Sequence, residues 1–287
     1  MTKKLLSLLM LMGAGSLFAQ DNLINALANN QGKDVQKYYQ IKPVFAIGVT
    51  DVKEQGHSGT CWSYTGASFL ESEMIKKGKQ PVDLAEIYTA RKVYLEKAIN
   101  YLRMHGALTW GDGGELHDVI NIYRKYGAVP QIAYTGLING ATKNNFKEMQ
   151  KDLEGYLKDI VASEKVPANW KEVFEQKLDT YLGAVPKTFM YNGKMYDPQS
   201  FAKEVVGLQD EKYIEMLSVE HKPKYQNTLM AVPDNWSYDY AFNVNMEDFI
   251  RTIDYALRKG YTVGWEADVS EKFFSWQNGD RKSTSEL

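Results

Sequence analysis

The stretch VKEQGHSGTCWSYTGASFL, from Val52 to Leu70, decides how the rest of the chain is interpreted, because it holds the only cysteine among 287 residues. Gln55 stands six positions before Cys61, and the aromatic residue Trp62 follows the cysteine at once. A buried structural cysteine is the ordinary alternative for a solitary thiol. The flanking glutamine, glycines and tryptophan favour a reactive thiol instead.

A helix is predicted from Cys61 to Lys77, with Ser58 or Thr60 placed to cap its start and Gly78 placed to end it. Cys61 would lie in the first turn, where unpaired backbone N–H groups and the helix dipole favour a thiolate. That effect is worth roughly 0.3–1 kcal/mol. It would lower a thiol pKa of about 8.5 only to about 7.8–8.3, which leaves roughly 5–15% thiolate at pH 7. Most of the activation must therefore come from an imidazolium partner.

Gln55 can place its side-chain amide next to Cys61. Together with the backbone N–H of Cys61, that amide would form a donor pair for the oxyanion of a tetrahedral intermediate. Gly56 and Gly59 would let the backbone turn tightly between the two residues. The predicted catalytic residues are therefore Cys61 and Gln55.

The run Gln55-Gly56, then Gly59-Thr60-Cys61-Trp62-Ser63-Tyr64, resembles the glutamine and cysteine segment of the papain-like cysteine peptidases. Ser58 stands where papain and the cathepsins usually carry a second, disulfide-bonded cysteine, which points to the bleomycin hydrolase and aminopeptidase C branch. The resemblance implies an α+β papain-like fold. A helical lobe would carry the catalytic cysteine at a helix N-terminus, a helical insertion would follow, and the β-rich second lobe would be truncated.

The N-terminal pattern and the resemblance together divide the chain into four predicted parts. These are a signal peptide at 1–19, the helical lobe at 20–135, the helical insertion at 136–235 and the incomplete start of the β-rich lobe at 236–287. Periodicity and turn residues predict the following elements: a helix from the cap Asp83 to Gly106, a helix from Leu116 to Gly127, two amphipathic helices between Lys143 and Gly183, a hairpin around Asn192-Gly193, a helix from the cap Asp197 to Val206, a strand at 240–244, a helix from the cap Asn245 to Gly260, and a strand at 261–265.

Asp112-Gly113-Gly114 predicts a tight extended turn between the cysteine helix and the helix that starts at Leu116. A double glycine by itself usually marks only a loop. Its place resembles the papain-family loop whose glycines lie along the substrate backbone. Gly113 and Gly114, together with Trp62, are therefore the predicted substrate-binding residues, and a plain turn is the alternative.

The N-terminus carries Lys3 and Lys4, then the apolar run from Leu5 to Phe18, then Ala19. This pattern predicts a secretory signal peptide cut near Ala19 and a periplasmic or secreted protein, with a buried N-terminal helix as the alternative. The run is shorter than the roughly 20 residues that span a bilayer, so no membrane association is expected after cleavage.

The formal charge of −2, from 34 basic and 36 acidic residues, gives no electrostatic case for binding nucleic acid. One cysteine and four scattered histidines form no metal-ligand spacing, so neither a metal nor another cofactor is expected.

The base of a papain-like enzyme is a histidine oriented by an asparagine. The chain has four histidines, each predicted to lie at the surface and none in a fitting setting: His57, His105, His117 and His221. Asn235-Trp236 and Gln277-Asn278 do not match the Asn-Ser-Trp motif of the family. We expect a truncated copy of a longer peptidase, with both partners beyond Leu287, and a natural non-catalytic remnant is the alternative.

The resemblance implies a thiol-dependent peptidase that hydrolyses peptide bonds through an acyl-enzyme on Cys61, of the aminopeptidase type. It also implies peptide substrates and a homo-oligomer, since related enzymes form hexameric rings. The first alternative is a papain-like protein that binds peptides along Gly113-Gly114 without cleaving them. The second, an acyl-transferring enzyme such as a transglutaminase, is disfavoured by the spacing of Gln55 and Cys61.

Overall fold

The structure is a computed structural model, and it describes residues 44, 46–163, 165–266, 274–275 and 280–281. The chain divides into two units, one from Ile47 to Trp265 and one that comprises Met1–Ala46 and Glu266–Leu287. In the second unit, β6 (Phe274–Ser275) pairs antiparallel with β7 (Asp280–Arg281). The predicted signal peptide lies outside the described residues. Among the helices that the structure describes, none is long and apolar enough to cross a membrane.

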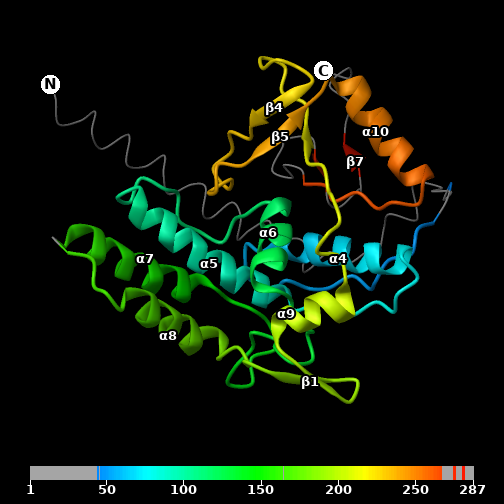
Figure 1. Cartoon of the computed structure of the whole chain (residues 1–287). Coiled ribbons are helices and arrows are strands. Elements are labelled where there is room, and N and C mark those ends of the chain that lie inside the picture. The colour runs from blue at the N-terminus through cyan, green and yellow to red at the C-terminus, as the bar shows by residue number, and fades with distance from the viewer. Residues whose placement is uncertain (1–43, 45, 164, 267–273, 276–279, 282–287) are drawn as a thin grey trace, which may run out of the picture. The chain divides into compact units, whose positions relative to one another are not determined.

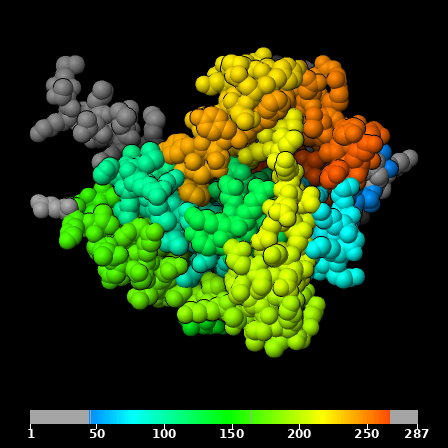
Figure 2. All heavy atoms as spheres, in the orientation of Figure 1, coloured from blue at the N-terminus to red at the C-terminus, as the bar shows by residue number. Residues whose placement is uncertain are grey.

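Five helices form the core of the 47–265 unit (Figure 1). They are α4 (Cys61–Lys76), α5 (Glu86–Arg103), α6 (Leu116–Tyr126), α7 (Lys147–Ala162) and α8 (Trp170–Leu182). The helices α4, α5 and α6 pack on one another, and the pair α7 and α8 packs on α5. Figure 2 shows α7 and α8 in green at the outer side of this group. The helix α5 therefore lies in the middle of the helical layer.

The cysteine helix α4 is central, as predicted, because both its apolar and its small residues are buried. Leu70 and Met74 are at most 2% exposed. Gly66 allows a close approach to α6, since a Cβ at this position would lie 2.4 Å from Cγ2 of Val119. Gly78 ends the helix with a φ of 72°, which only glycine adopts at little cost.

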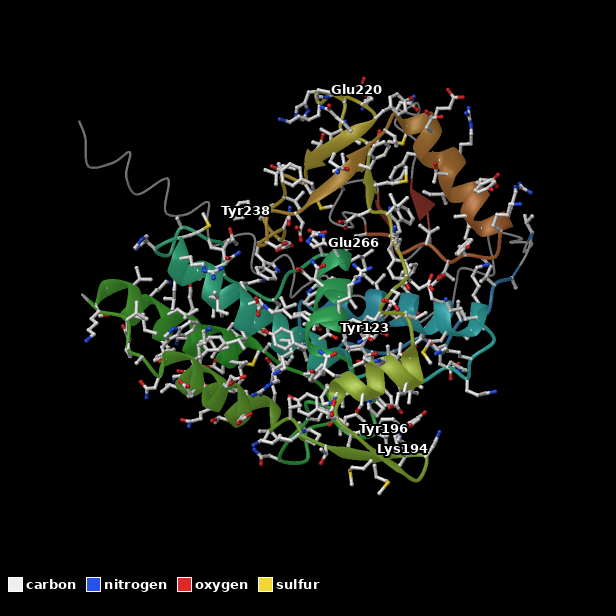
Figure 3. All side chains as sticks on the ribbon, viewed as in Figure 1. Tyr123, Lys194, Tyr196, Glu220, Tyr238 and Glu266 are labelled. Atoms are coloured by element: carbon white, nitrogen blue, oxygen red, sulfur yellow. The ribbon has the colours of Figure 1, made fainter. Side chains whose placement is uncertain are left out.

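A hairpin and a short helix cover the far end of the helical layer. The strands β1 (Phe189–Tyr191) and β2 (Lys194–Tyr196) pair across Asn192-Gly193, where both residues have positive φ, as predicted. Asp197 caps α9 (Pro198–Phe201), which continues as the short π-helix Ala202–Val206. The hydroxyl of Tyr123 donates to the carbonyl of Ala202 and so ties α6 to this end of the unit (Figure 3).

A three-stranded sheet follows in the order β3-β5-β4, with β3 (Met216–Leu217) parallel and β4 (Gln226–Leu229) antiparallel to β5 (Tyr240–Asn243). The buried amide of Asn243 donates to the carbonyls of Val219, Lys222 and Pro223, which fixes the connection between β3 and β4. Asn245 caps the amphipathic helix α10 (Met246–Arg258), as predicted. None of the residues of α10 is buried.

Three local predictions were wrong. The segment 261–265 is not a strand, because the described residues provide no neighbouring strand for its backbone groups, although its exposure alternates as in a strand. Asp83 does not cap α5, since its carboxylate binds Lys53 and the helix begins at Glu86. Thr60 holds the N-cap position of α4 without a side-chain capping bond, and its hydroxyl contacts that of Ser58. The division into helical lobe, insertion and β-rich lobe stays a prediction.

Candidate functional site

Cys61 is the first residue of α4, and its side chain is exposed and not in a disulfide. The two residues that follow it are buried and anchored. The indole Nε1 of Trp62 donates to the carbonyl of Asp112 at 2.8 Å, and the hydroxyl of Ser63 donates to the carbonyl of Glu86 at 2.8 Å. The thiol therefore has the position in the first helical turn that the sequence predicts, on a backbone that is held from two sides.

A tight turn precedes the cysteine. The side-chain Nε2 of Gln55 donates to the carbonyl of Ser58 at 2.6 Å, and the Ser58 hydroxyl donates back to the carbonyl of Gln55 at 2.9 Å. Gly56 has a φ of 68°, and a Cβ there would lie 2.8 Å from the backbone N and O of Asn144. The turn therefore requires glycine at this position. One of the two amide N–H groups of Gln55 is used inside the turn, and its role as an oxyanion donor stays a prediction.

The segment with the double glycine lies beside the residues on either side of the cysteine, Gly59 and Trp62. Gly59 donates its backbone N–H to Oδ2 of Asp112 at 2.8 Å. A Cβ on Gly114 would lie 2.8 Å from the indole of Trp62, and a Cβ on Gly113 would lie 2.0 Å from Oδ1 of Asp234. The structure therefore brings Gly113 and Gly114 to the start of α4, while peptide binding along them stays a prediction.

A buried lysine, Lys97, forms hydrogen bonds with the backbone of the glycine segment. The ammonium of Lys97 donates to the carbonyls of Gly111 and Gly113, and the side chain is 2% exposed. Burial lowers the pKa of Lys97, and the carboxylates of Asp118 and Asp234 oppose this effect. Sequence reasoning missed Lys97, because a lysine in an amphipathic helix carries no signal that distinguishes it from a solvated one.

A partly buried lysine, Lys53, holds the segment before Gln55. The ammonium of Lys53 lies 2.8 Å from Glu71, 2.6 Å from Asp83 and 2.7 Å from Glu86. The side chains of Glu71 and Glu86 are fully buried. These three carboxylates are close enough together to hold a metal ion, but the lysine ammonium already contacts all of them.

The charges of this cluster affect one another. Burial alone would lower the pKa of Lys53, but Glu86, Asp83 and Glu71 outweigh it and raise that pKa. Burial raises the pKa of Glu86, and Lys53 only partly offsets this effect. Since Glu71 belongs to α4 and Glu86 to α5, the cluster ties the strip that carries Gln55 to both helices.

His117 is not a surface residue as predicted, since its side chain is only 11% exposed. Its Nδ1 lies 2.8 Å from the carboxylate of Glu215, and its Nε2 lies 3.1 Å from the hydroxyl of Ser237. The order of hydroxyl, imidazole and carboxylate matches that of a catalytic triad. However, Glu215, Asp118 and Asp239 outweigh burial and raise the pKa of His117 to about 9. The protonated ring cannot act as a base at neutral pH.

The partners of His117 lie 98 and 120 residues away in the chain, so no local pattern could have revealed them. The ring instead joins α6 to Glu215, which precedes β3, and to Ser237 in the loop before β5. The other three histidines, His57, His105 and His221, are exposed as predicted.

No family model matches the chain. Aminopeptidase C from Lactococcus lactis subsp. lactis is 22% identical over 277 residues, which are 80% of this chain and 62% of that protein. Aminopeptidase C from Streptococcus thermophilus is 24% identical over 275 residues, which are 79% of this chain and 61% of that protein. The chain therefore spans less than two thirds of the length of these relatives.

The fold is similar to a solved one. The crystal structure of PepW from Lactobacillus rhamnosis HN001 matches with a TM-score of 0.60 at 18% identity, over 91% of this chain and 69% of that one. This match confirms a mixed fold of helices and small sheets like that of PepW. The resemblance seen in the sequence is confirmed at the level of distant similarity: the chain is distantly similar to aminopeptidase C over about 80% of its length.

Proposed function

We propose that this protein is a thiol-dependent peptidase in which Cys61 attacks the carbonyl carbon of a peptide bond. The observation that carries the proposal is the exposed thiol at the first position of α4, on a backbone anchored by Trp62 and Ser63. The relatives named aminopeptidase C support an action on the N-terminal residues of peptides. The basic and apolar N-terminus supports export.

The chemistry assigns a role to each group. The sulfur of Cys61 forms a C–S bond, and the carbonyl oxygen becomes an oxyanion that the N–H of Cys61 and the amide of Gln55 would stabilise. The amine leaves with a proton from an acid, and water then hydrolyses the thioester. His117 is not that acid and base, because Glu215 and Ser237 hold its protonated ring. The proposal therefore requires a different imidazole.

The test is hydrolysis of aminoacyl coumarin amides by purified variants. Cys61→Ala should abolish turnover, and unchanged turnover would refute the proposal. Gln55→Ala should lower kcat by about 10²- to 10³-fold, as for other oxyanion donors. Gln209→Ala is the matched control and should leave turnover unchanged. Among the described residues, the side-chain amide of Gln209 donates only to the exposed Gln199, at 3.4 Å. A loss below about threefold for Gln55→Ala would remove this residue from the site.

The contacts of His117 with Glu215 and Ser237 favour a second candidate function, in which the protein binds peptides at the glycine segment without cleaving them. Peptide binding to both the wild-type chain and Cys61→Ala, with no turnover by either, would establish it.

A further inference from the structure

We propose that Asp234 forms an anionic subsite beside Cys61 that selects peptides with a cationic group on the residue lying against Gly113. The cation is either the free α-ammonium of the peptide or the side chain of a lysine or arginine. The claim that Asp234 selects peptides rests on the proposed function. The claim that Asp234 places a negative charge beside the thiol does not depend on it. Asp234 belongs to the loop between β4 and β5, far from Cys61 in the sequence.

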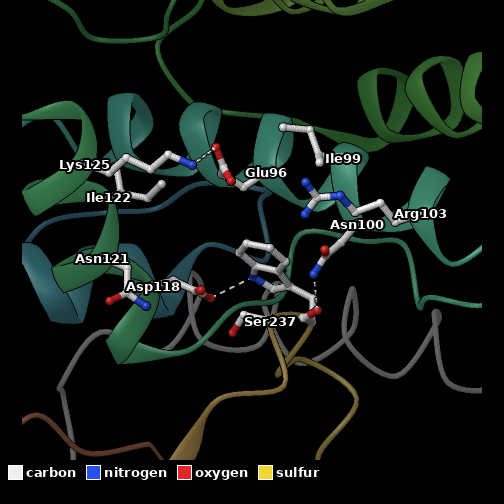
Figure 4. Close-up of a pocket in the computed structure, with 10 residues that line it drawn as sticks. Glu96, Ile99, Asn100, Arg103, Asp118, Asn121, Ile122, Lys125 and Ser237 are labelled. Carbon is white, nitrogen blue, oxygen red and sulfur yellow. Dashed lines mark hydrogen bonds and ion pairs between the residues drawn. The ribbon is translucent and has the colours of Figure 1, made fainter.

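The loop that carries Asp234 is fixed by buried side chains. The amide of Asn235 donates to the carbonyls of Met230 and Asp239 at 2.8 and 2.9 Å, which closes the loop on itself. The indole of Trp236 donates to Asp118 at 2.8 Å. Asn100 donates to the carbonyl of Trp236 at 3.2 Å. Trp236 lines a cavity of about 280 Å³ between α5 and α6, and Figure 4 shows Asp118 and Asn100 among the other lining residues. Asp234 is thus presented by a rigid support.

The carboxylate of Asp234 lies directly on Gly113. A Cβ at position 113 would be 2.0 Å from Oδ1 and 2.3 Å from Cγ of Asp234, so any other residue there would displace the carboxylate. Asp234 is exposed. Its carboxylate makes no hydrogen bond or ion pair within the part of the chain that the structure describes. It is therefore available to a cation that enters from solvent.

The charges around Asp234 leave the subsite anionic. The buried ammonium of Lys97 feels the charge of Asp234 but donates its hydrogen bonds to the carbonyls of Gly111 and Gly113. Two further carboxylates, Asp112 and Asp118, act on the same ammonium. The carbonyl of Gly113 already accepts a hydrogen bond from Lys97, so it is less able to bind the backbone of a peptide. A charged contact with Asp234 would add to the binding of the peptide at this point.

The glycine segment connects Asp234 to the residues that flank the thiol. Asp112, the neighbour of Gly113, accepts a hydrogen bond from the N–H of Gly59 and another from the indole of Trp62. These two residues flank Cys61 closely on either side. A peptide residue spans about 3.3–3.6 Å when extended. The proposal therefore places the cation within one or two residues of the carbonyl that the sulfur attacks.

The first experiment measures the charge beside the thiol without requiring activity. Since Cys61 is the only cysteine, thiol reagents report on this position alone. The rate constants are measured for a cationic reagent, 2-(trimethylammonium)ethyl methanethiosulfonate, and for neutral methyl methanethiosulfonate. Asp234→Asn should lower the ratio of the cationic to the neutral rate about two- to threefold, because it removes a solvent-screened attraction for the cationic reagent. Asp210→Asn, an exposed carboxylate in another loop, should leave the ratio unchanged. An unchanged ratio in Asp234→Asn overturns the inference.

The second experiment identifies the source of the cation. It measures kcat/KM for coumarin amides of lysine and of norleucine, each prepared with a free and with an acetylated α-amine. Asp234→Asn should lower kcat/KM more for the cationic substrates than for acetyl-norleucine. A loss confined to free amines assigns the α-ammonium, and a loss confined to lysine assigns the side chain. Equal losses for all four substrates overturn the inference. If the wild-type protein cleaves none of them, the proposed function fails, and the reagent ratio alone decides whether Asp234 supplies the charge.

Discussion

Replacing Lys53 by methionine should destabilise the protein far more than an ordinary lysine replacement does. The variant leaves the fully buried carboxylates of Glu71 and Glu86 without the ammonium that contacts both of them. Removing one partner of a buried ion pair costs about 3–5 kcal/mol, because an uncompensated charge remains in the interior. Methionine keeps most of the volume of the side chain, so the loss reports mainly on charge.

The matched control is Lys143→Met. Lys143 pairs with Glu54, which lies in the same strip as Lys53, but both side chains are at least half exposed. Exposed pairs contribute about 0–1 kcal/mol. The difference in stability between the two variants therefore compares a buried ion-pair cluster with an exposed ion pair, and both of them hold the same segment.

The assay is urea unfolding at pH 7 and pH 5, with the free energy of unfolding taken from each curve. The deficit of Lys53→Met should shrink at pH 5, because burial already raises the pKa of Glu86 and its protonation removes the uncompensated charge. A loss below about 1 kcal/mol at pH 7, equal to that of Lys143→Met, would refute the reasoning.

Two other variants test the packing and the charges of the helical layer. His117 has a folded-state pKa of about 9, above its unfolded value, so its stabilisation is present below about pH 6.5 and is lost as the pH rises through 9. The wild-type protein should therefore lose on the order of 3 kcal/mol more than His117→Gln between these pH values, and parallel profiles would contradict the assignment. Gly66→Ala should cost about 1–3 kcal/mol in chemical unfolding, because its Cβ would lie 2.4 Å from Val119. Gly155→Ala in α7 meets nothing within 4 Å and should stabilise the helix, so equal effects would disprove the close approach of α4 and α6.

Most of the helices and the hairpin could be predicted from the sequence, because their signals are local. Asn192-Gly193 needs only its own positive φ angles to set the hairpin. Asp197 and Asn245 cap the helices that directly follow them. The first-turn position of Cys61 follows from the apolar run after it and from Gly78 at its end.

The electrostatics of the site could not be predicted, because they depend on residues that meet only in the folded chain. Asp83 fits a helix cap as well as an ion pair, and the choice is made by Lys53, which lies 30 positions earlier. His117 is surrounded by carboxylates from a strand end and a distant loop. Asp234 gives no pattern in the sequence that places it on Gly113.

The strand predicted at 261–265 shows a different limit of local patterns. Tyr261, Val263 and Trp265 are exposed and alternate with less exposed residues, which is the periodicity of a strand. A strand also requires a partner for its backbone N–H and C=O groups. No residue that the structure describes provides one, so the periodicity alone does not produce a strand there.

The central claim is that the sulfur of Cys61 attacks peptide carbonyls, and intact-mass analysis after reaction with an aminoacyl thioester tests it most directly. We expect a single acyl adduct that maps to Cys61, forms more slowly in Gln55→Ala and is absent from Cys61→Ala. A wild-type protein that stays unmodified, or an adduct of equal yield in Cys61→Ala, would contradict the account.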